Sequence, residues 1–243
     1  MSDFRGYPQA GARSTGIDQG LRAYMQKVYS YMAGGLALTG AAAVATFNMA
    51  VTSEGSLTTF GNTLFHGPLM WVLIIASLGI VMFLSFGIQR MSVATAQLSF
   101  WAYAALMGMS FASLGLVYTH GSIARVFFIT AATFASTSLY GYTTKRDMTG
   151  FGSFLFMGLI GLIIASVVNI FLQSSAMNFA LSVIGVLLFT GLTAWDTQQI
   201  KTIYYSTSGE ASLGKSAIMG ALRLYLDFIN LFLSLLRLFG DRR

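Results

Sequence analysis

Residues 68–88 form one continuous apolar stretch, PLMWVLIIASLGIVMFLSFGI, which contains no charged side chain. About 20 consecutive apolar residues are enough for a helix to cross the hydrocarbon core of a bilayer. The apolar residues are contiguous, whereas a membrane β-barrel needs apolar and polar residues to alternate along each strand. Pro68 stands where a helix tolerates proline, in the first turn. This stretch therefore predicts a transmembrane helix.

Similar stretches recur on both sides of it. Of the 243 residues, 55% are hydrophobic and 9% are charged, whereas a soluble domain carries roughly 25% charged residues. Inside lipid, only helices and closed barrels satisfy every backbone hydrogen-bonding group. We therefore predict an all-α membrane protein, a bundle of seven transmembrane helices. The predicted spans are Val28–Met49, Pro68–Ile88, Val93–Tyr118, Val126–Thr144, Phe151–Leu172, Met177–Ile200 and Ser216–Phe239.

The composition divides the chain into two parts. Residues 1–27 hold Pro8, several Gly and Ser, and four basic residues, which predicts a polar and largely flexible N-terminal tail. Its last part, Asp18 to Lys27, is interpreted as an amphipathic lead-in. The tail lacks the short apolar core and small-residue cleavage site of a signal peptide. Residues 28–243 form the predicted transmembrane domain.

Several kinds of site are excluded or disfavoured. The sequence has no cysteine, so disulfides and thiolate metal sites are impossible. Its two histidines, His66 and His120, are too few and too far apart to indicate a zinc site. The net charge of +6 comes from basic residues scattered singly between apolar runs, which is typical of membrane-protein loops and not of a nucleic-acid groove. We expect no bound cofactor and no nucleic-acid partner, and the bilayer is the expected surroundings.

The basic residues also predict an orientation. With the N-terminus in the cytoplasm, nine basic residues lie on the cytoplasmic side and three on the outer side, which agrees with the positive-inside rule. Seven spans then place the C-terminus outside, where Arg242 and Arg243 argue against it. A last segment that does not cross fully would remove this conflict. The nine are Arg5, Arg13, Arg22, Lys27, Arg90, Lys145, Arg146, Lys201 and Lys215.

Charged residues occur inside the predicted spans only near the C-terminal end of the chain. The sixth span contains Asp196 and the seventh contains Arg223, Asp227 and Arg237. Counted from the cytoplasmic basic residues at about 1.5 Å per residue, Asp196 lies about 8 Å and Asp227 about 18 Å along its helix. A charge within a membrane helix is costly and marks function by default. We weigh this above the alternative, a structural ion pair or a carboxylate that reaches water.

The two aspartates are expected to meet, because both lie inward from the cytoplasmic side of the membrane on two antiparallel spans. Two carboxylates in one dry site cannot both be ionised cheaply, so the pair is expected to share a proton. Such a pair can also receive a hard divalent cation such as calcium. Arg223, one turn before Asp227, can pair with this carboxylate, and Asn230 extends the polar stripe.

The residues around the aspartates carry a family resemblance. They read GLTAWDTQQIK over residues 191–201 and LYLDFINLFL over residues 224–233. With seven spans and this length, the chain resembles the Bax inhibitor-1 family, in one of its bacterial branches, from Val28 to Phe239. The resemblance implies six helices around a central C-terminal helix and a pH-sensitive calcium leak of the inner membrane.

The resemblance also assigns roles to single residues. It implies that Asp196 and Asp227 are the sensor of protons. The same two residues are the candidate calcium ligands, because their oxygens can receive a divalent cation. The resemblance implies further that an arginine at the inner end of the second span latches onto the pair, and Arg90 is the candidate for this role. Arg223 is the competing latch or tuning residue. Some bacterial members have a glutamate in the second span, but residues 69–88 contain no acidic residue, so no step that needs it carries over.

Three other functions were weighed against a channel. An intramembrane aspartyl protease expects a Gly-x-Gly-Asp motif, but Asp227 follows Leu-Tyr-Leu. A rhomboid-like serine protease rests on Ser153 with His120 and has no second motif. We therefore expect no enzymatic activity. The remaining alternative is a non-conducting regulator that binds a membrane protease or another membrane partner.

Overall fold

The computed structural model describes residues 10–52 and 54–243, with side chains from residue 19 onward. These residues are mainly helical, and seven of the helices are long and apolar enough to cross a membrane. The prediction of an all-α membrane protein with seven spans is confirmed. In chain order the helices are α1 (Ala10–Ala50), α2 (Thr59–Phe65), α3 (Pro68–Gly87), α4 (Val93–Phe111), α5 (Leu114–Val117), α6 (His120–Thr143), α7 (Thr149–Leu172), α8 (Ser175–Ser206) and α9 (Glu210–Phe239).

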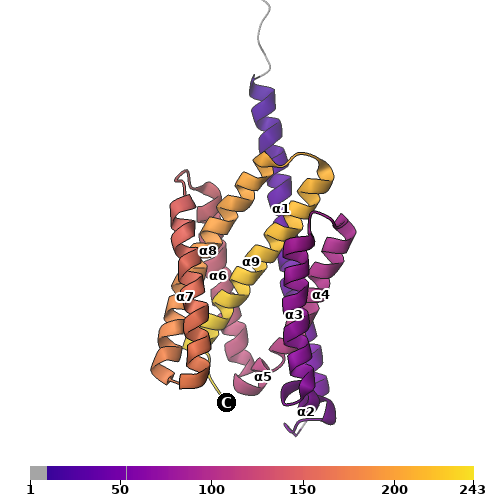
Figure 1. Ribbon diagram of the computed structural model, residues 1–243, viewed down its shortest axis with the longest axis vertical. Coiled ribbons are helices and arrows are strands. Elements are labelled where there is room, and N and C mark those ends of the chain that lie inside the picture. Colours follow the sequence, from indigo (N-terminus) through magenta and orange to yellow (C-terminus); the bar gives the residue numbers. More distant parts are fainter. Residues whose placement is uncertain (1–9, 53) are drawn as a thin grey trace, which may run out of the picture.

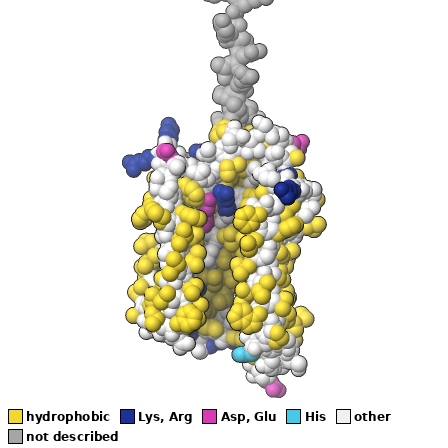
Figure 2. Space-filling view, viewed as in Figure 1, with side chains coloured by type: hydrophobic (Ala, Val, Ile, Leu, Met, Phe, Trp, Pro, Cys, Tyr) yellow, Lys and Arg dark blue, Asp and Glu magenta, His cyan; other side chains and the backbone are white. Residues whose placement is uncertain are grey.

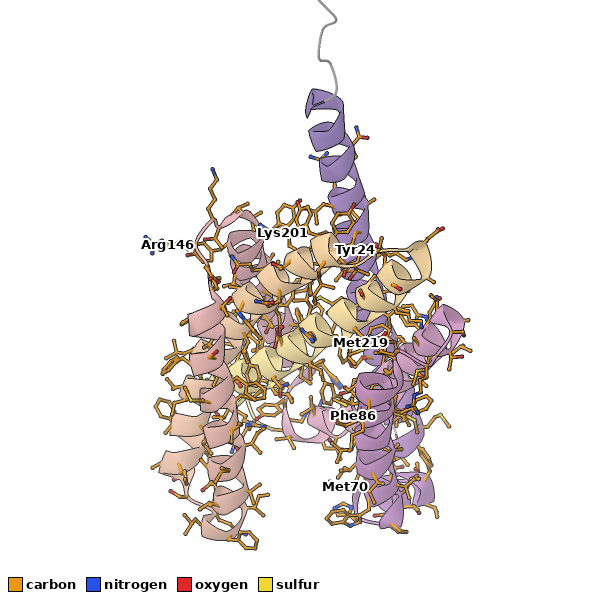
Figure 3. The ribbon with its side chains drawn as sticks, turned by 45° about the horizontal axis from the view of Figure 1, so that its top comes forward. Tyr24, Met70, Phe86, Arg146, Lys201 and Met219 are labelled. Carbon is orange, nitrogen blue, oxygen red and sulfur yellow. The ribbon has the colours of Figure 1, made fainter. Side chains whose placement is uncertain are left out.

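The seven long helices alternate in direction, so the bundle has two distinct ends (Figure 1). The proximal end, as we call it, is where α1 enters and where the chain passes from α3 to α4, from α6 to α7 and from α8 to α9. The distal end carries α2, α5 and the C-terminus. In Figure 3, Tyr24, Arg146 and Lys201 lie toward the proximal end and Met70 toward the distal end.

Helix α9 is the central element of the bundle. It packs against α1, α4, α6 and α8, and a larger share of its span is buried than of any other candidate span. Helices α3 and α7 lie at the periphery, where they pack mainly on α4 and α8. Both expose most of their apolar side chains, as expected of helices that face lipid. The two peripheral helices stand on either side of α9 (Figure 1).

Buried hydroxyl groups join helices that are far apart in the sequence. The Thr39 hydroxyl on α1 donates to the carbonyl oxygen of Ala104 on α4 at 2.8 Å. The same hydroxyl oxygen lies 2.7 Å from the Tyr225 hydroxyl on α9. A second chain of hydroxyls connects Tyr29 of α1, Ser138 of α6 and Thr197 of α8. Because a buried hydroxyl is costly without a partner, these networks fix how the helices are rotated.

The approach of α6 to α8 depends on a glycine. A Cβ atom added to Gly141 would overlap the carbonyl oxygen of Ala194 on α8. On α7, a Cβ added to Gly161 would meet no atom within 4 Å. Small residues of this kind allow membrane helices to pack with their backbones in contact.

We therefore expect Gly141→Val to destabilise the folded bundle, because α6 must move away from α8 to make room. Overpacking of this kind costs about 1–3 kcal/mol. Thermal unfolding in detergent should show a lower Tm for Gly141→Val than for the unaltered chain. Gly161→Val is the matched control and should melt like the unaltered chain. Equal Tm values for the two variants would contradict the packing argument.

Several helix boundaries differ from the predicted ones. The predicted division at Lys27 falls inside α1, because Leu21, Tyr24 and Met25 are buried in the core and the helix continues through them. The part of the predicted tail before residue 10 lies outside the described residues. Other helices also extend past the predicted ends. For example, α6 begins at His120, and the Thr119 side chain caps it. The third predicted span is divided into α4 and α5.

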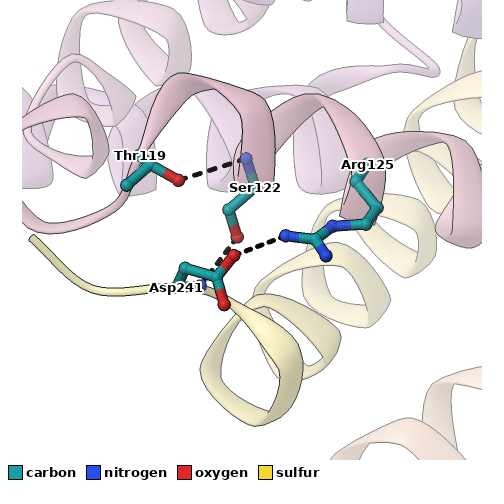
Figure 4. Close-up of polar contacts among 4 residues, drawn as sticks. All are labelled: Thr119, Ser122, Arg125 and Asp241. Carbon is teal, nitrogen blue, oxygen red and sulfur yellow. Dashed lines mark hydrogen bonds and ion pairs between the residues drawn. The ribbon is translucent and has the colours of Figure 1, made fainter.

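The C-terminus is fastened to the start of α6, at the distal end (Figure 4). The backbone N–H of Asp241 donates to the Ser122 hydroxyl at 2.8 Å, and Asp241 forms an ion pair with Arg125. The Thr119 N–H donates to the carbonyl oxygen of Asp241 at 3.0 Å. Helix α9 is long and apolar enough to cross a membrane, and the C-terminus lies at the end of the bundle opposite to the start of α1.

Candidate functional site

The two aspartates singled out from the sequence lie on α8 and α9, two antiparallel helices that contact each other extensively. Asp196 is 7% exposed and Asp227 is 5% exposed. Nearby core residues of α9 are apolar, including Leu224 and Phe228, which are almost fully buried. Each carboxyl group is therefore held in an apolar environment by one of the two helices.

The structure brings the two carboxyl groups together, each within hydrogen-bonding reach of the other. One oxygen of each group, Oδ1 of Asp196 and Oδ2 of Asp227, is buried without a hydrogen-bond donor. Ionised carboxylates are acceptors only, so a hydrogen bond between two of them requires one proton on the pair. The arrangement can therefore hold and release a proton as a unit.

Arg223 is the charged neighbour of the pair, and it pairs across helices. Its Nη1 atom on α9 lies 3.8 Å from Oδ1 of Asp196 on α8. This distance is too long for a hydrogen bond, so the contact is electrostatic. The expectation that Arg223 pairs with Asp227 within its own helix was incomplete, since the ion pair goes to Asp196. Arg223 consequently links α9 to α8.

Arg90, the latch implied by the family resemblance, is not brought to the aspartates. It lies just beyond α3 and is exposed. No ion pair joins its side chain to any described carboxylate. The connection from α3 to α9 comes instead from Lys215, whose ammonium donates to the carbonyl oxygen of Gln89 at 3.0 Å.

The aspartate pair opens into a cavity of about 730 Å³ between α7, α8 and α9. Figure 2 shows this face of the molecule hollowed between two apolar masses, with acidic and basic side chains inside the hollow. The α7 wall is mostly apolar and includes Leu159, Ile163 and Val167. Most of the polar groups lie on α9, and Asp196 lies on α8. The cavity thus exposes the charged pair to the side of the bundle.

A second cavity, of about 510 Å³, lies at the proximal end between the end of α3 and the α8–α9 turn. It is lined by Lys215 and by several hydroxyl side chains, among them Ser212 and Ser216. Arg223 lines both cavities. We call the cavity at the aspartate pair the lateral cavity and the one at the α8–α9 turn the proximal cavity. The ion pair of Arg223 with Asp196 therefore lies between the two.

The aspartate pair supplies only part of the ligands that a calcium ion takes. The described part of the chain contains no group of three or more His, Cys, Asp and Glu side chains that could hold a metal ion. Calcium takes 6–8 oxygen ligands, and the two carboxylates supply at most four oxygens. A calcium ion bound by Asp196 and Asp227 would need water or carbonyl oxygens as its remaining ligands.

Sequence reasoning missed Ser234 and noted Arg237 as a charge in the seventh span without assigning it to the site. Ser234 and Arg237 line the lateral cavity together with Asp227 and Asn230. They continue the same helical face at spacings of four and three residues, and this periodicity is the signal that could have found them. The serine-protease alternative is not supported by position, since His120 begins α6 at the distal end and Ser153 lies near the proximal start of α7.

Comparison with known proteins places the chain among bacterial membrane proteins. The family model described as inhibitor of apoptosis-promoting Bax1 matches residues 21–243. The chain is 48% identical over 226 residues to the inner membrane protein YbhL of Escherichia coli K12, covering 92% of this chain and 94% of that protein. It is 48% identical over 243 residues to an uncharacterized protein of Rickettsia prowazekii, with 100% of both covered. It is 37% identical to an uncharacterized membrane protein of Streptococcus pyogenes, covering 93% of this chain and 96% of that protein.

Proposed function

Because the chain belongs to the Bax inhibitor-1 family, we propose that it is a pH-sensitive calcium leak channel or transporter of the bacterial inner membrane. The observation that carries this proposal is the buried pair of Asp196 and Asp227 at the junction of two cavities, with Arg223 between them. Because the pair shares a proton, its negative charge depends on pH. At the junction of the two cavities, this charge sets how widely the path for calcium opens. The inner-membrane location follows that of YbhL.

In this proposal the charge on the pair sets the state of the path. At higher pH the pair is fully ionised and attracts Arg223, which holds α9 to α8 and narrows the junction. At lower pH a proton lowers the negative charge and weakens this attraction. The two helices can then separate, and calcium passes along the carboxylate oxygens. The leak should therefore rise as the pH falls.

The orientation that we propose places the proximal end in the cytoplasm. The chain passes through this end at Arg90, at Lys145 and Arg146, and at Lys215. The distal end carries Arg125, which pairs with Asp241, and the terminal arginines. An excess of Lys and Arg marks the cytoplasmic side, so the N-terminus is inside and the C-terminus outside.

The test is calcium flux in proteoliposomes made from the purified chain and loaded with a calcium-sensitive dye. We expect calcium entry above that of protein-free vesicles, and entry that increases from alkaline to acid pH. A chain that acts only by binding a membrane protease or another membrane partner would show no entry at any pH. That result would reject the channel and leave the non-conducting regulator. No catalytic residue is needed by either function.

A further inference from the structure

A third cavity, of about 400 Å³, lies between α1 and α6 in the distal half of the bundle. We call it the distal cavity. Phe228, Ile229 and Phe232 of α9 form its floor, and all three are buried. Residues of α4 and α5 complete its wall. Pockets that bind small molecules have this size and a mostly apolar lining. The distal cavity is therefore a candidate ligand site that contains neither aspartate.

The distal cavity opens sideways, toward the lipid. Its rim carries two strongly exposed apolar side chains, Val44 on α1 and Phe128 on α6. Gly40 also lines the cavity, and a Cβ atom added there would meet no atom within 4 Å. The lining offers few polar groups, whereas an ordered water needs roughly two to four polar partners. Hydrocarbon is thus a better occupant of this cavity than water.

The cavity is about as long as one leaflet of a bilayer. Its lining on α1 extends from Leu36 to Asn48. These two residues are 12 positions apart, which corresponds to about 18 Å at 1.5 Å per residue. The hydrocarbon core of a bilayer is about 30 Å thick, so one leaflet contributes about 15 Å. A single acyl chain therefore matches the length of the cavity, whereas a molecule that crosses the whole core does not.

The distal end of the cavity carries a positive charge. Nη2 of Arg243 lies 3.3 Å from Nδ1 of His120, which lines the cavity. A guanidinium can only donate, so Nδ1 accepts this hydrogen bond and the neutral imidazole carries its proton on Nε2. No ion pair joins Arg243 to a described carboxylate. Both side chains can therefore still donate to the oxygens of an acidic group.

The C-terminal segment holds Arg243 in this place. The Arg243 backbone N–H donates to the carbonyl oxygen of Val117 at 3.0 Å. Two residues earlier, the carbonyl oxygen of Asp241 accepts from the Thr119 N–H at 3.0 Å. The Asp241 side chain is paired with Arg125 (Figure 4). The charge of Arg243 is thus fixed beside the cavity, and its acidic neighbour is already neutralised by another residue.

We propose that the distal cavity binds one phospholipid of the adjacent leaflet, with one acyl chain inside the cavity and the phosphate at Arg243 and His120. Charge-assisted hydrogen bonds from Arg to phosphate are strong, and the apolar chain suits the aromatic floor. The sideways opening leaves room for the second acyl chain against Val44 and Phe128, which a free fatty acid would not use. This site is separate from the aspartate pair, and its occupancy does not depend on calcium conduction.

The experiment is photo-crosslinking in proteoliposomes. The probe is phosphatidylglycerol that carries a diazirine at the end of one acyl chain, and mass spectrometry locates the label. We expect label on Phe228, Ile229 and Phe232, because lipid that only surrounds the bundle does not reach these buried residues. The exposed Phe154 on α7 is the reference, which surrounding lipid labels in every sample. Label on α7 without label on the floor of the cavity would overturn the proposal.

Two substitutions fill the cavity from opposite walls. Gly40→Phe on α1 and Ala124→Phe on α6 place a ring where the acyl chain is expected, so both variants should lose the label on the floor. Gly79→Phe is the matched control and should keep it, since Gly79 on α3 is exposed, has open space around an added Cβ and does not line this cavity. Thermal unfolding checks that each variant is folded. Floor labelling in both cavity variants equal to that in Gly79→Phe would reject the cavity as the site of the chain.

Arg243→Gln tests the recognition of the headgroup. We expect floor labelling to fall about fivefold, which is the upper effect of an exposed charge pair. Arg146→Gln, in the exposed turn between α6 and α7 at the proximal end, should label like the unaltered chain. A fatty acid with the same diazirine chain is the comparison probe. Floor labelling that is unchanged in Arg243→Gln, and equal for the phospholipid and the fatty acid, would overturn the proposal, because the headgroup would then play no part.

Discussion

Asp227→Asn is expected to abolish the pH dependence of calcium flux, and Asp196→Asn is expected to do the same. The two carboxyl groups lie within hydrogen-bonding reach of each other and share one apolar site. An asparagine amide has nearly the shape of a protonated carboxylic acid but does not titrate between acid and alkaline pH. Removing either partner leaves a single carboxylate, so the shared proton that senses pH is lost.

The measurement is initial calcium entry into proteoliposomes at a series of pH values. Flux itself should persist, because the neutral amide imitates the protonated and open state of the pair. Asp147→Asn is the matched control, since Asp147 lies in the exposed turn between α6 and α7 and its loss should leave the profile intact. If both buried variants keep the profile of the unaltered chain, the pair is structural and the sensor role is wrong.

The sequence was sufficient to predict the class of fold and the aspartate pair. Contiguous apolar stretches such as residues 68–88 leave a helix as the only solution in lipid. Counting residues inward from Lys201 and Lys215 placed the two aspartates on the same half of antiparallel helices. Both arguments use only distance along a helix, which the sequence gives directly.

Rotation about the helix axes could not be predicted in the same way. Asn230, Ser234 and Arg237 are periodic in the sequence, but whether they face a partner helix or a cavity depends on how α7 and α8 pack. The partner of Arg223 was missed for the same reason. Its spacing from Asp227 suggested a contact within one helix, while the packing of α9 on α8 directs the guanidinium to Asp196.

The ends of the helices could not be predicted from apolar stretches either, because they depend on local capping. Thr119 accepts a hydrogen bond from the N–H of Ser122 and starts α6 six residues before the predicted span. At the other end of the chain, burial of Leu21 and Tyr24 extends the helical domain into the predicted tail. Polar caps and interfacial residues carry no apolar signal, so a search for apolar stretches passes over them.

Arg223→Ala is expected to raise the calcium leak at alkaline pH, while Arg90→Ala should leave it unchanged. Arg223 joins α9 to Asp196 on α8, at the point where the lateral and proximal cavities meet. Arg90 is exposed and pairs with neither aspartate. The structure thus favours a latch between α8 and α9 over the latch from the second span that the family resemblance implied.

The size of the effect follows from the exposure of the pair. The Arg223 side chain is 45% exposed and its contact is long, so its ion pair is worth at most about 1 kcal/mol, the upper value for exposed pairs. Losing it raises the open population by up to about fivefold. The leak should be measured at alkaline pH, where the aspartates are ionised and the latch is closed. At acid pH both variants should match the unaltered chain, because the proton on the pair has already released Arg223. A fivefold rise at alkaline pH in Arg90→Ala, with a normal closed state in Arg223→Ala, would restore the second-span latch and reject the one proposed between α8 and α9.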